Sequence, residues 1–293
     1  MSARAFSSDE ARAYVHAPHS GSDKYSRGVV GFVTGSVNFP GAALLGIDGA
    51  LHAGIGMVRY VGPEVVGAAV LQHRPEVVLG DARAQAWVVG SGVTGGDAAQ
   101  LAAAAHVLDE ARPAVVDAGA LNLLSRHARG LVIATPHAGE LAQLLGVSRA
   151  AVEAEPEDFV TLAARFLGVT VVLKGATTYI AGEGGCVRLE APTSWLAVAG
   201  AGDVLAGIMG AILASHCAAS PGVTAEGNVP DGESTDTGSA GVTETDLVAI
   251  AATAVWIHSE AAQRASRGGP FVLAELVSQI PHVIAGLVAP ESD

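Results

Sequence analysis

Residues 131–145 read LVIATPHAGELAQLL, and this stretch shows the strand–loop–helix pattern that decides the fold. Residues 131–135 form a short apolar run typical of a buried strand, Pro136 stops that strand, and residues 139–145 begin a helix. The pattern repeats along the chain, with further strands predicted at 29–34, 57–61, 86–89, 114–117 and 169–173 and helices at 40–54, 97–111 and 204–215. Short apolar strands that alternate with helices predict an α/β fold whose mostly parallel sheet is covered by helices on both faces.

Polar residues and glycines follow the ends of these predicted strands. In parallel α/β sheets, ligands bind outside the carboxyl ends of the strands. The clusters at such ends are Gly90-Ser91-Gly92, Asp117, Thr135-Pro136-His137-Ala138-Gly139-Glu140, and Lys174-Gly175. Their shared position therefore predicts one ligand site along this edge of the sheet.

The sharpest motif is AGAGD at residues 199–203, directly before the apolar helix predicted at 204–215. Small residues let the backbone approach a ligand closely, and the N–H groups at a helix N-terminus can hold a phosphate. Asp203 would then lie beside that phosphate, where it can take a proton from an attacking hydroxyl. The alternative is that Asp203 only caps a buried helix.

Four further residues follow predicted strands, and for each the chemical interpretation has to be weighed against a structural one. Lys174 suits a polyphosphate, although a lysine at a strand end can also simply reach solvent. Glu140 can serve as a helix cap, and His137 alone is a weak signal. Asp117 can orient a ligand or only fix its own loop.

In this order the motifs resemble the ribokinase-like superfamily, and within it the ADP- or ATP-dependent NAD(P)H-hydrate dehydratases. The resemblance runs from about residue 24 to residue 282. It rests on PGAAL at residues 40–44, GSG at 90–92, DAGAL at 117–121, TPHAGE at 135–140, VLKGATT at 172–178, AGAGDVLAG at 199–207, VWIH at 255–258 and residues 271–281. It implies a single domain over residues 1–293, built as a three-layer αβα sandwich.

The resemblance also implies roles for particular residues. The nucleotide would contact Lys174, Gly175, Ala176, Thr177, Thr178, Gly200, Ala201 and Gly202. The hydrated nicotinamide cofactor would lie against Ala42 or Ala43, Gly92, His137 and Asp203, with Asp203 as the catalytic base. Glu140 stands where related kinases carry an acidic residue linked to Mg²⁺, and no direct metal ligand is assigned.

Two positions depart from the family pattern. The family usually has Thr or Ser where Ala201 stands, and often Pro where Ser91 stands. Backbone N–H groups can still form an anion site without a hydroxyl at residue 201. Many relatives carry an N-terminal epimerase domain, for which the segment before Lys24 is too short, so we expect any epimerase to be a separate partner.

The function implied is dehydration of hydrated NADH or NADPH, with ADP as the favoured phosphoryl donor, Mg²⁺ as cofactor and a homotetramer as the assembly. One alternative is a small-molecule kinase of the same fold that acts on a vitamin-precursor alcohol. The other is a catalytically weak nucleotide-binding or assembly protein. PGAAL and TPHAGE favour the dehydratase, whereas the departures at Ala201 and Ser91 are the only support for the weak binder.

Composition limits the other classes of function. The net charge is −13 and no long run of Lys or Arg occurs, which argues against nucleic acid and anionic membranes as partners. The N-terminus lacks the apolar core of a signal peptide, and the longest apolar runs are too short to span a bilayer, so a cytoplasmic protein is predicted. Residues 218–246 are acidic and rich in Gly, Ser and Thr, without Lys or Arg, which predicts a disordered surface insertion.

Overall fold

The computed structural model describes residues 3–124, 128, 130–219 and 241–289. In this part of the chain, ten strands form one sheet in the order β1-β10-β9-β8-β7-β6-β5-β2-β3-β4. The strands from β2 to β8 pair in parallel, and only β9 runs antiparallel to its neighbours. The strands are β1 (Arg4–Ala5), β2 (Val29–Val33), β3 (Met57–Tyr60), β4 (Val78–Leu79), β5 (Ala86–Val89), β6 (Ala114–Val116), β7 (Val132–Ala134), β8 (Thr170–Leu173), β9 (Thr177–Gly182) and β10 (Gly185–Glu190).

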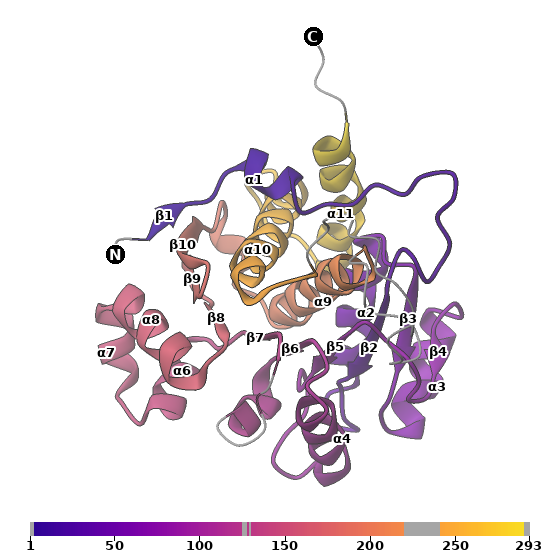
Figure 1. Cartoon of the computed structure of the whole chain (residues 1–293), viewed down its shortest axis with the longest axis horizontal. Helices are drawn as coiled ribbons and strands as arrows, with labels where there is room; N and C mark the ends of the chain where they lie inside the picture. Colours follow the sequence, from indigo (N-terminus) through magenta and orange to yellow (C-terminus); the bar gives the residue numbers. More distant parts are fainter. Residues whose placement is uncertain (1–2, 125–127, 129, 220–240, 290–293) are drawn as a thin grey trace, which may run out of the picture.

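Helices cover both faces of this sheet, as Figure 1 shows. One face packs against α1 (Ser8–Arg12), α2 (Pro40–His52), α3 (Glu64–His73), α9 (Ala201–Ala219), α10 (Glu244–Ser266) and α11 (Leu273–Val288). The other face packs against α4 (Ala98–Asp109), the 3₁₀ helix η1 (Ala118–Leu123), α6 (Ala138–Leu145), α7 (Arg149–Ala154) and α8 (Pro156–Leu167). A second 3₁₀ helix, η2 (Ser194–Leu196), precedes α9. The predicted three-layer sandwich with a mostly parallel sheet is confirmed.

The central strands are apolar at consecutive positions because helices bury them from both sides. All residues of β2, β5, β6, β7 and β8 are buried. Successive side chains of a strand point to opposite faces, so a strand between two helical layers needs apolar residues throughout. This explains why short uninterrupted apolar runs, rather than alternating ones, marked the strands in the sequence.

Close packing of α2 against α9 determines where the turn before α9 lies. The backbone of the two helices touches, since a Cβ added to Gly207 would lie only 1.9 Å from the carbonyl oxygen of Gly46. On the other side of the contact, a Cβ on Gly49 would lie 2.5 Å from the carbonyl oxygen of Val204. Only residues without a side chain allow this approach, so these glycines set the position of the start of α9.

We expect Gly207→Ala to destabilise the protein, because the added methyl group has to push α2 and α9 apart. Overpacking of a core typically costs about 1–3 kcal/mol, against a gain of up to about 1 kcal/mol in helix propensity. Gly286→Ala in α11 is the matched control, since its added Cβ meets no atom within 4 Å and it should unfold at an equal or higher temperature. Thermal unfolding of the two variants tests this packing, and equal behaviour would contradict it.

Several element boundaries differ from those predicted. Helix α9 begins at Ala201 rather than Val204, so Gly202 and Asp203 lie inside its first turn. Of the predicted insertion at 218–246, residues 218–219 complete α9 and Glu244 to Asp246 open α10 behind a capping box formed by Thr243. Residues 220–240 lie outside the described residues. Helix α11 continues through Pro281 to Val288, although the sequence motif ended at this proline.

Helix α9 is long and apolar enough to cross a membrane by length and composition, and it is the one such helix in the described part of the chain. About 72% of its apolar window is buried inside the protein. This is the environment of a core helix, so the prediction of a buried helix is confirmed. The prediction that this run is too short to span a bilayer is wrong, because α9 begins before Val204 and ends after Ala214. The other predicted apolar helix, now part of α10, is also largely buried.

Candidate active site

A buried ion pair lies at the carboxyl ends of the central strands. Asp117 follows β6 and Lys174 follows β8, and the distance from Lys174 Nζ to Asp117 Oδ1 is 2.8 Å. The hydroxyl of Thr135, after β7, donates to the same oxygen at 2.7 Å. The hydroxyl of Ser91, after β5, donates to Asp117 Oδ2 at 2.9 Å. Four neighbouring strands thus contribute to one network, which gives Asp117 a definite role in positioning Lys174.

Both members of the pair are ionised. Burial by itself would raise the pKa of Asp117, but the charge and hydrogen bonds of Lys174, Thr135 and Ser91 hold that pKa below its usual value. Burial would lower the pKa of Lys174, but Asp117 and then Glu140 and Asp203 raise it above its usual value. The site therefore holds a fixed ammonium group at the edge of the sheet, suited to a phosphate.

Asp203 lies in the first turn of α9, and its charge acts on this lysine. The chain reaches α9 through Gly200, whose φ of +91° disfavours any side chain and whose added Cβ would strike Leu45 and Leu273. A Cβ added to Gly202 would be 3.5 Å from Lys174 Nζ, so the ammonium group faces the N-terminus of α9. Burial, and then the charge of Asp117, raise the pKa of Asp203 to about 6 against the effect of Lys174. A carboxylate with this pKa is well suited to act as a general base near neutral pH.

We expect Gly202→Ala to weaken ADP binding at least about tenfold, because its methyl group would occupy the space between α9 and the lysine. The fold should tolerate the change, since 3.5 Å is an ordinary contact distance and alanine favours a helix over glycine. Calorimetric titration with ADP measures the affinity, and thermal unfolding checks that the variant is folded. Unchanged ADP affinity would show that the phosphate does not lie at this turn.

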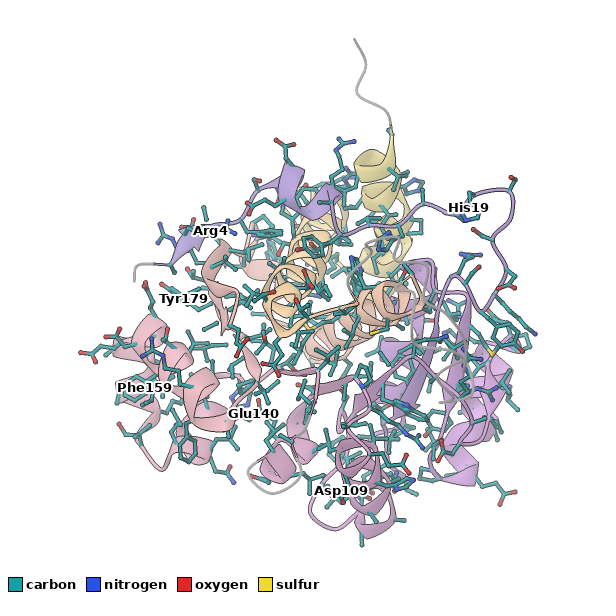
Figure 2. The ribbon with its side chains drawn as sticks, in the orientation of Figure 1. Arg4, His19, Asp109, Glu140, Phe159 and Tyr179 are labelled. Atoms are coloured by element: carbon teal, nitrogen blue, oxygen red, sulfur yellow. The ribbon has the colours of Figure 1, made fainter. Side chains whose placement is uncertain are left out.

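His137 and Glu140 form the N-terminal cap of α6. His137 Nδ1 accepts hydrogen bonds from the N–H groups of Gly139 and Glu140, and Glu140 Oε2 accepts one from the N–H of His137 at 2.8 Å. The structural interpretation of these residues therefore holds. The cap leaves both side chains able to meet a ligand: the His137 side chain is 58% exposed, and the charge of Glu140, labelled in Figure 2, raises the pKa of Lys174.

A cavity of about 620 Å³ opens between α6, α7 and the turn that joins β8 to β9. Four predicted nucleotide contacts line it, namely Lys174, Gly175, Ala176 and Thr177, together with His137. Thr178 lies one residue further along β9 and is buried. Two other lining residues, Arg149 and Tyr179, were missed from the sequence because α7 and the β9–β10 hairpin were not predicted. Tyr179 is labelled in Figure 2.

Three of the predicted cofactor contacts, Ala42, Ala43 and Gly92, lie in the first turn of α2 and just after β5, whereas His137 lines the cavity with the predicted nucleotide contacts. Gly92, with φ of +66°, packs against Ala42, because an added Cβ would be only 2.5 Å from that of Ala42. Ala43 is completely buried beneath Gly35, so its side chain presents no surface to a ligand. Their contact with a substrate stays a prediction, and Ala42 and Gly92 are the better placed of the three.

The donor set fits a magnesium ion held mainly by phosphates. Mg²⁺ usually binds through one or two carboxylates together with substrate phosphates and water. The charges of Glu140 and Asp203 both act on Lys174, which brings two carboxylates to the predicted phosphate site. Among the described residues, no three His, Cys, Asp or Glu side chains are grouped to form a metal site of their own.

Solved structures with the same architecture identify the fold. A Bacillus subtilis ADP/ATP-dependent NAD(P)H-hydrate dehydratase, crystallised with ATP and Mg²⁺, matches with a TM-score of 0.80, covering 98% of this chain and 99% of that one at 24% identity. A ribokinase-like superfamily protein from Enterococcus faecalis matches with a TM-score of 0.78 at 20% identity, covering 98% of this chain and 97% of that one. The fold is therefore that of the ribokinase-like superfamily.

Sequence similarity narrows this class to one family. The NAD(P)H-hydrate dehydratase family matches residues 30–281, and the chain belongs to this family. It is 37% identical over 212 residues to the ADP-dependent (S)-NAD(P)H-hydrate dehydratase of Neisseria meningitidis, covering 66% of this chain and 71% of that protein. It is 45% identical over 209 residues to the bifunctional NAD(P)H-hydrate repair enzyme Nnr of Mycobacterium tuberculosis, covering 66% of this chain. The match spans only 42% of that bifunctional relative.

Proposed function

We propose that this protein converts hydrated NADH or NADPH back to NAD(P)H, using ADP and releasing AMP and phosphate. The observation that carries the proposal is the arrangement of Asp203, with its pKa raised to about 6, opposite the ammonium group of Lys174 at the N-terminus of α9. The arrangement offers a base for a hydroxyl group and a cation for the phosphate that this hydroxyl attacks.

Hydroxide is a poor leaving group, so the hydrate's hydroxyl has to be phosphorylated before it can depart. Asp203 takes the hydroxyl proton as the oxygen attacks the β-phosphorus of ADP, and the bond from that phosphorus to the oxygen of AMP breaks. Lys174 and the N–H groups at the start of α9 stabilise the charge that develops on the phosphoryl group. The ring nitrogen then expels phosphate, and loss of a proton from the neighbouring ring carbon restores the dihydronicotinamide.

Magnesium would be supported by Glu140 together with the nucleotide phosphates, and it would supply further neutralisation of the phosphoryl charge. The missing hydroxyl at Ala201 leaves backbone N–H groups as the anion donors in this turn. The second departure is Ser91, which stands where the family often has proline. Its hydroxyl donates a hydrogen bond to Asp117, which a proline could not do.

The test is to incubate the purified protein with hydrated NADH, Mg²⁺ and either ADP or ATP, and to follow the absorbance band of reduced nicotinamide. Recovery of absorbance with release of phosphate supports the dehydratase and identifies the donor. A stable phosphorylated product from a vitamin-precursor alcohol would instead support a kinase. Tight nucleotide binding without turnover of any substrate would support the weak binding protein.

Partners and location are part of the same proposal. The family resemblance supports a cytoplasmic homotetramer that cooperates with a separate epimerase. Sedimentation of the purified chain measures its oligomeric state. Repair of the opposite hydrate epimer should require an added epimerase.

A further inference from the structure

The cavity that Lys174 lines contains a second cation, which the proposed reaction does not use. This cation is Arg149, the first residue of α7. Its side chain is 70% exposed and pairs with Glu153, itself 50% exposed, one turn further along the helix. A solvent-exposed pair of this kind adds little to stability. The stability of α7 therefore does not account for an arginine at this position.

Arg149 lies beside His137, at the start of α6. A Cβ added to Gly139 would be 3.1 Å from His137 Cε1 and 4.0 Å from Arg149 Cδ, so the stem of the arginine passes the same turn of α6 as the imidazole. Both side chains line the cavity of about 620 Å³, and the His137 side chain is 58% exposed. Because His137 is a predicted contact of the hydrated cofactor, Arg149 belongs to the part of the wall that this cofactor would meet.

The pair with Glu153 holds the guanidinium group in place but uses only part of it. Arg149 Nε donates to Glu153 Oε1 at 2.7 Å. The two terminal amino groups have no partner among the described residues, so their donors can bind a ligand. They lie in one plane, and this arrangement matches two oxygens of a phosphate group.

Two ligands of the proposed reaction carry phosphates, and only one of them needs a further cation. The phosphates of ADP meet Lys174 and the start of α9. Hydrated NADPH carries an additional phosphate on the 2′-oxygen of its adenosine ribose, where hydrated NADH has a hydroxyl. In Rossmann-type sites, a nearby arginine accommodates this 2′-phosphate. Arg149 stands next to a predicted cofactor contact and offers the same chemistry.

We propose that Arg149 is a specificity-determining residue: its guanidinium group binds the 2′-phosphate of hydrated NADPH, so that the protein prefers hydrated NADPH to hydrated NADH. The inference rests on the proposed function, because it concerns the substrate of the same site. The contact lies at an exposed position, where salt screens it. The preference for hydrated NADPH should therefore decrease as the ionic strength rises.

The test measures kcat and KM for the two hydrated cofactors at saturating ADP, with Arg149→Gln and Arg149→Lys beside the wild type. We expect kcat/KM of the wild type to be at least about tenfold higher for hydrated NADPH, because the phosphate contact is charge-assisted. Arg149→Gln should bring the two values within about threefold of each other by raising KM for hydrated NADPH alone. Arg149→Lys keeps the charge but loses the planar pair of donors, so it should retain only part of the preference.

Arg165→Gln is the matched control, because Arg165 is an exposed arginine in the neighbouring helix α8 and lines a different cavity, at the amino ends of β7 and β8. It should leave the preference unchanged, and calorimetry should find the same ADP affinity in both glutamine variants and the wild type. The proposal is overturned if the wild type has no preference, if Arg149→Gln lowers kcat/KM equally for both cofactors, or if it weakens ADP binding instead.

Binding of the repaired cofactors separates this inference from the proposed function. NADPH and NADH differ by the same 2′-phosphate, and calorimetry measures their affinities without turnover. If the wild type restores neither hydrate but binds NADPH more tightly than NADH, and Arg149→Gln abolishes this difference, the function fails and the inference stands. If both hydrates are restored and Arg149→Gln leaves the ratio of their kcat/KM values unchanged, the inference fails and the function stands.

Discussion

Replacing Asp203 with asparagine is expected to lower kcat by at least about a thousandfold while leaving ADP binding within about threefold of the wild type. Asparagine keeps the shape of the side chain but cannot accept the hydroxyl proton. Restoration of NADH under saturating substrates measures kcat, and calorimetry measures ADP binding. Near-normal turnover by Asp203→Asn would remove Asp203 from the mechanism.

The folded state of this variant should be at least as stable as the wild type. A carboxyl whose folded pKa is raised to about 6 binds protons more tightly in the folded protein than in the unfolded chain. Its ionised form therefore destabilises the fold above the unfolded pKa, and this penalty is relieved as the pH falls through about 6. Asp203→Asn removes the penalty at pH 7, so a higher unfolding temperature would separate a catalytic loss from misfolding. Asp158→Asn, at an exposed position in α8, is the control and should keep full activity.

The pKa of about 6 for Asp203 also predicts that activity falls on the acid side of the pH profile. The base must be ionised, so kcat/KM should fall about tenfold per pH unit below about 6. Phosphate groups also titrate near this pH, so ADP affinity has to be measured separately across the same range. An acid limb that follows ADP affinity alone would assign it to the nucleotide instead of Asp203.

Replacing Lys174 with methionine is expected to affect both stability and binding. Removal of one member of a buried ion pair typically costs about 3–5 kcal/mol, because the remaining charge is left uncompensated. Asp117 is that remaining charge, and its side chain is only 4% exposed. ADP affinity should fall as well, since the cation facing α9 is lost. Lys24→Met is the natural control, because the sequence contains only these two lysines and Lys24 lies against Tyr25, away from the site.

The double variant Lys174→Met/Asp117→Asn distinguishes the two effects. Removing the carboxylate should restore much of the stability, while activity and ADP affinity stay low. Acidification should also restore stability to the single variant Lys174→Met. Without its cation Asp117 has a raised pKa, so the destabilising effect of its buried charge diminishes as the pH falls. In the wild type the pKa of Asp117 is lowered, so its stabilising contribution is lost on acidification. Equal stability of the single and double variants would show that the pair is not coupled.

Local sequence patterns predicted the strands and helices that carry the site because each has a short-range physical signal. The apolar residues Val132–Ala134 are buried between the two helical layers, and Gly200 allows the turn with positive φ directly before α9. The hairpin of β9 and β10 was missed, because its strands lie toward the edge of the sheet and its residues alternate between buried and exposed. Helix α7 was missed as well, and with it Arg149 on the wall of the cavity.

The sequence by itself determined the α/β class, the order of the motifs, and the family to which the chain belongs. Only the tertiary structure decided that Asp117 pairs with Lys174 and that Ser91 and Thr135 complete this network. Lys174 lies 57 residues from Asp117, so no local pattern joins them. Their contact arises because the parallel strands β5, β6, β7 and β8 are neighbours and end at one edge of the sheet.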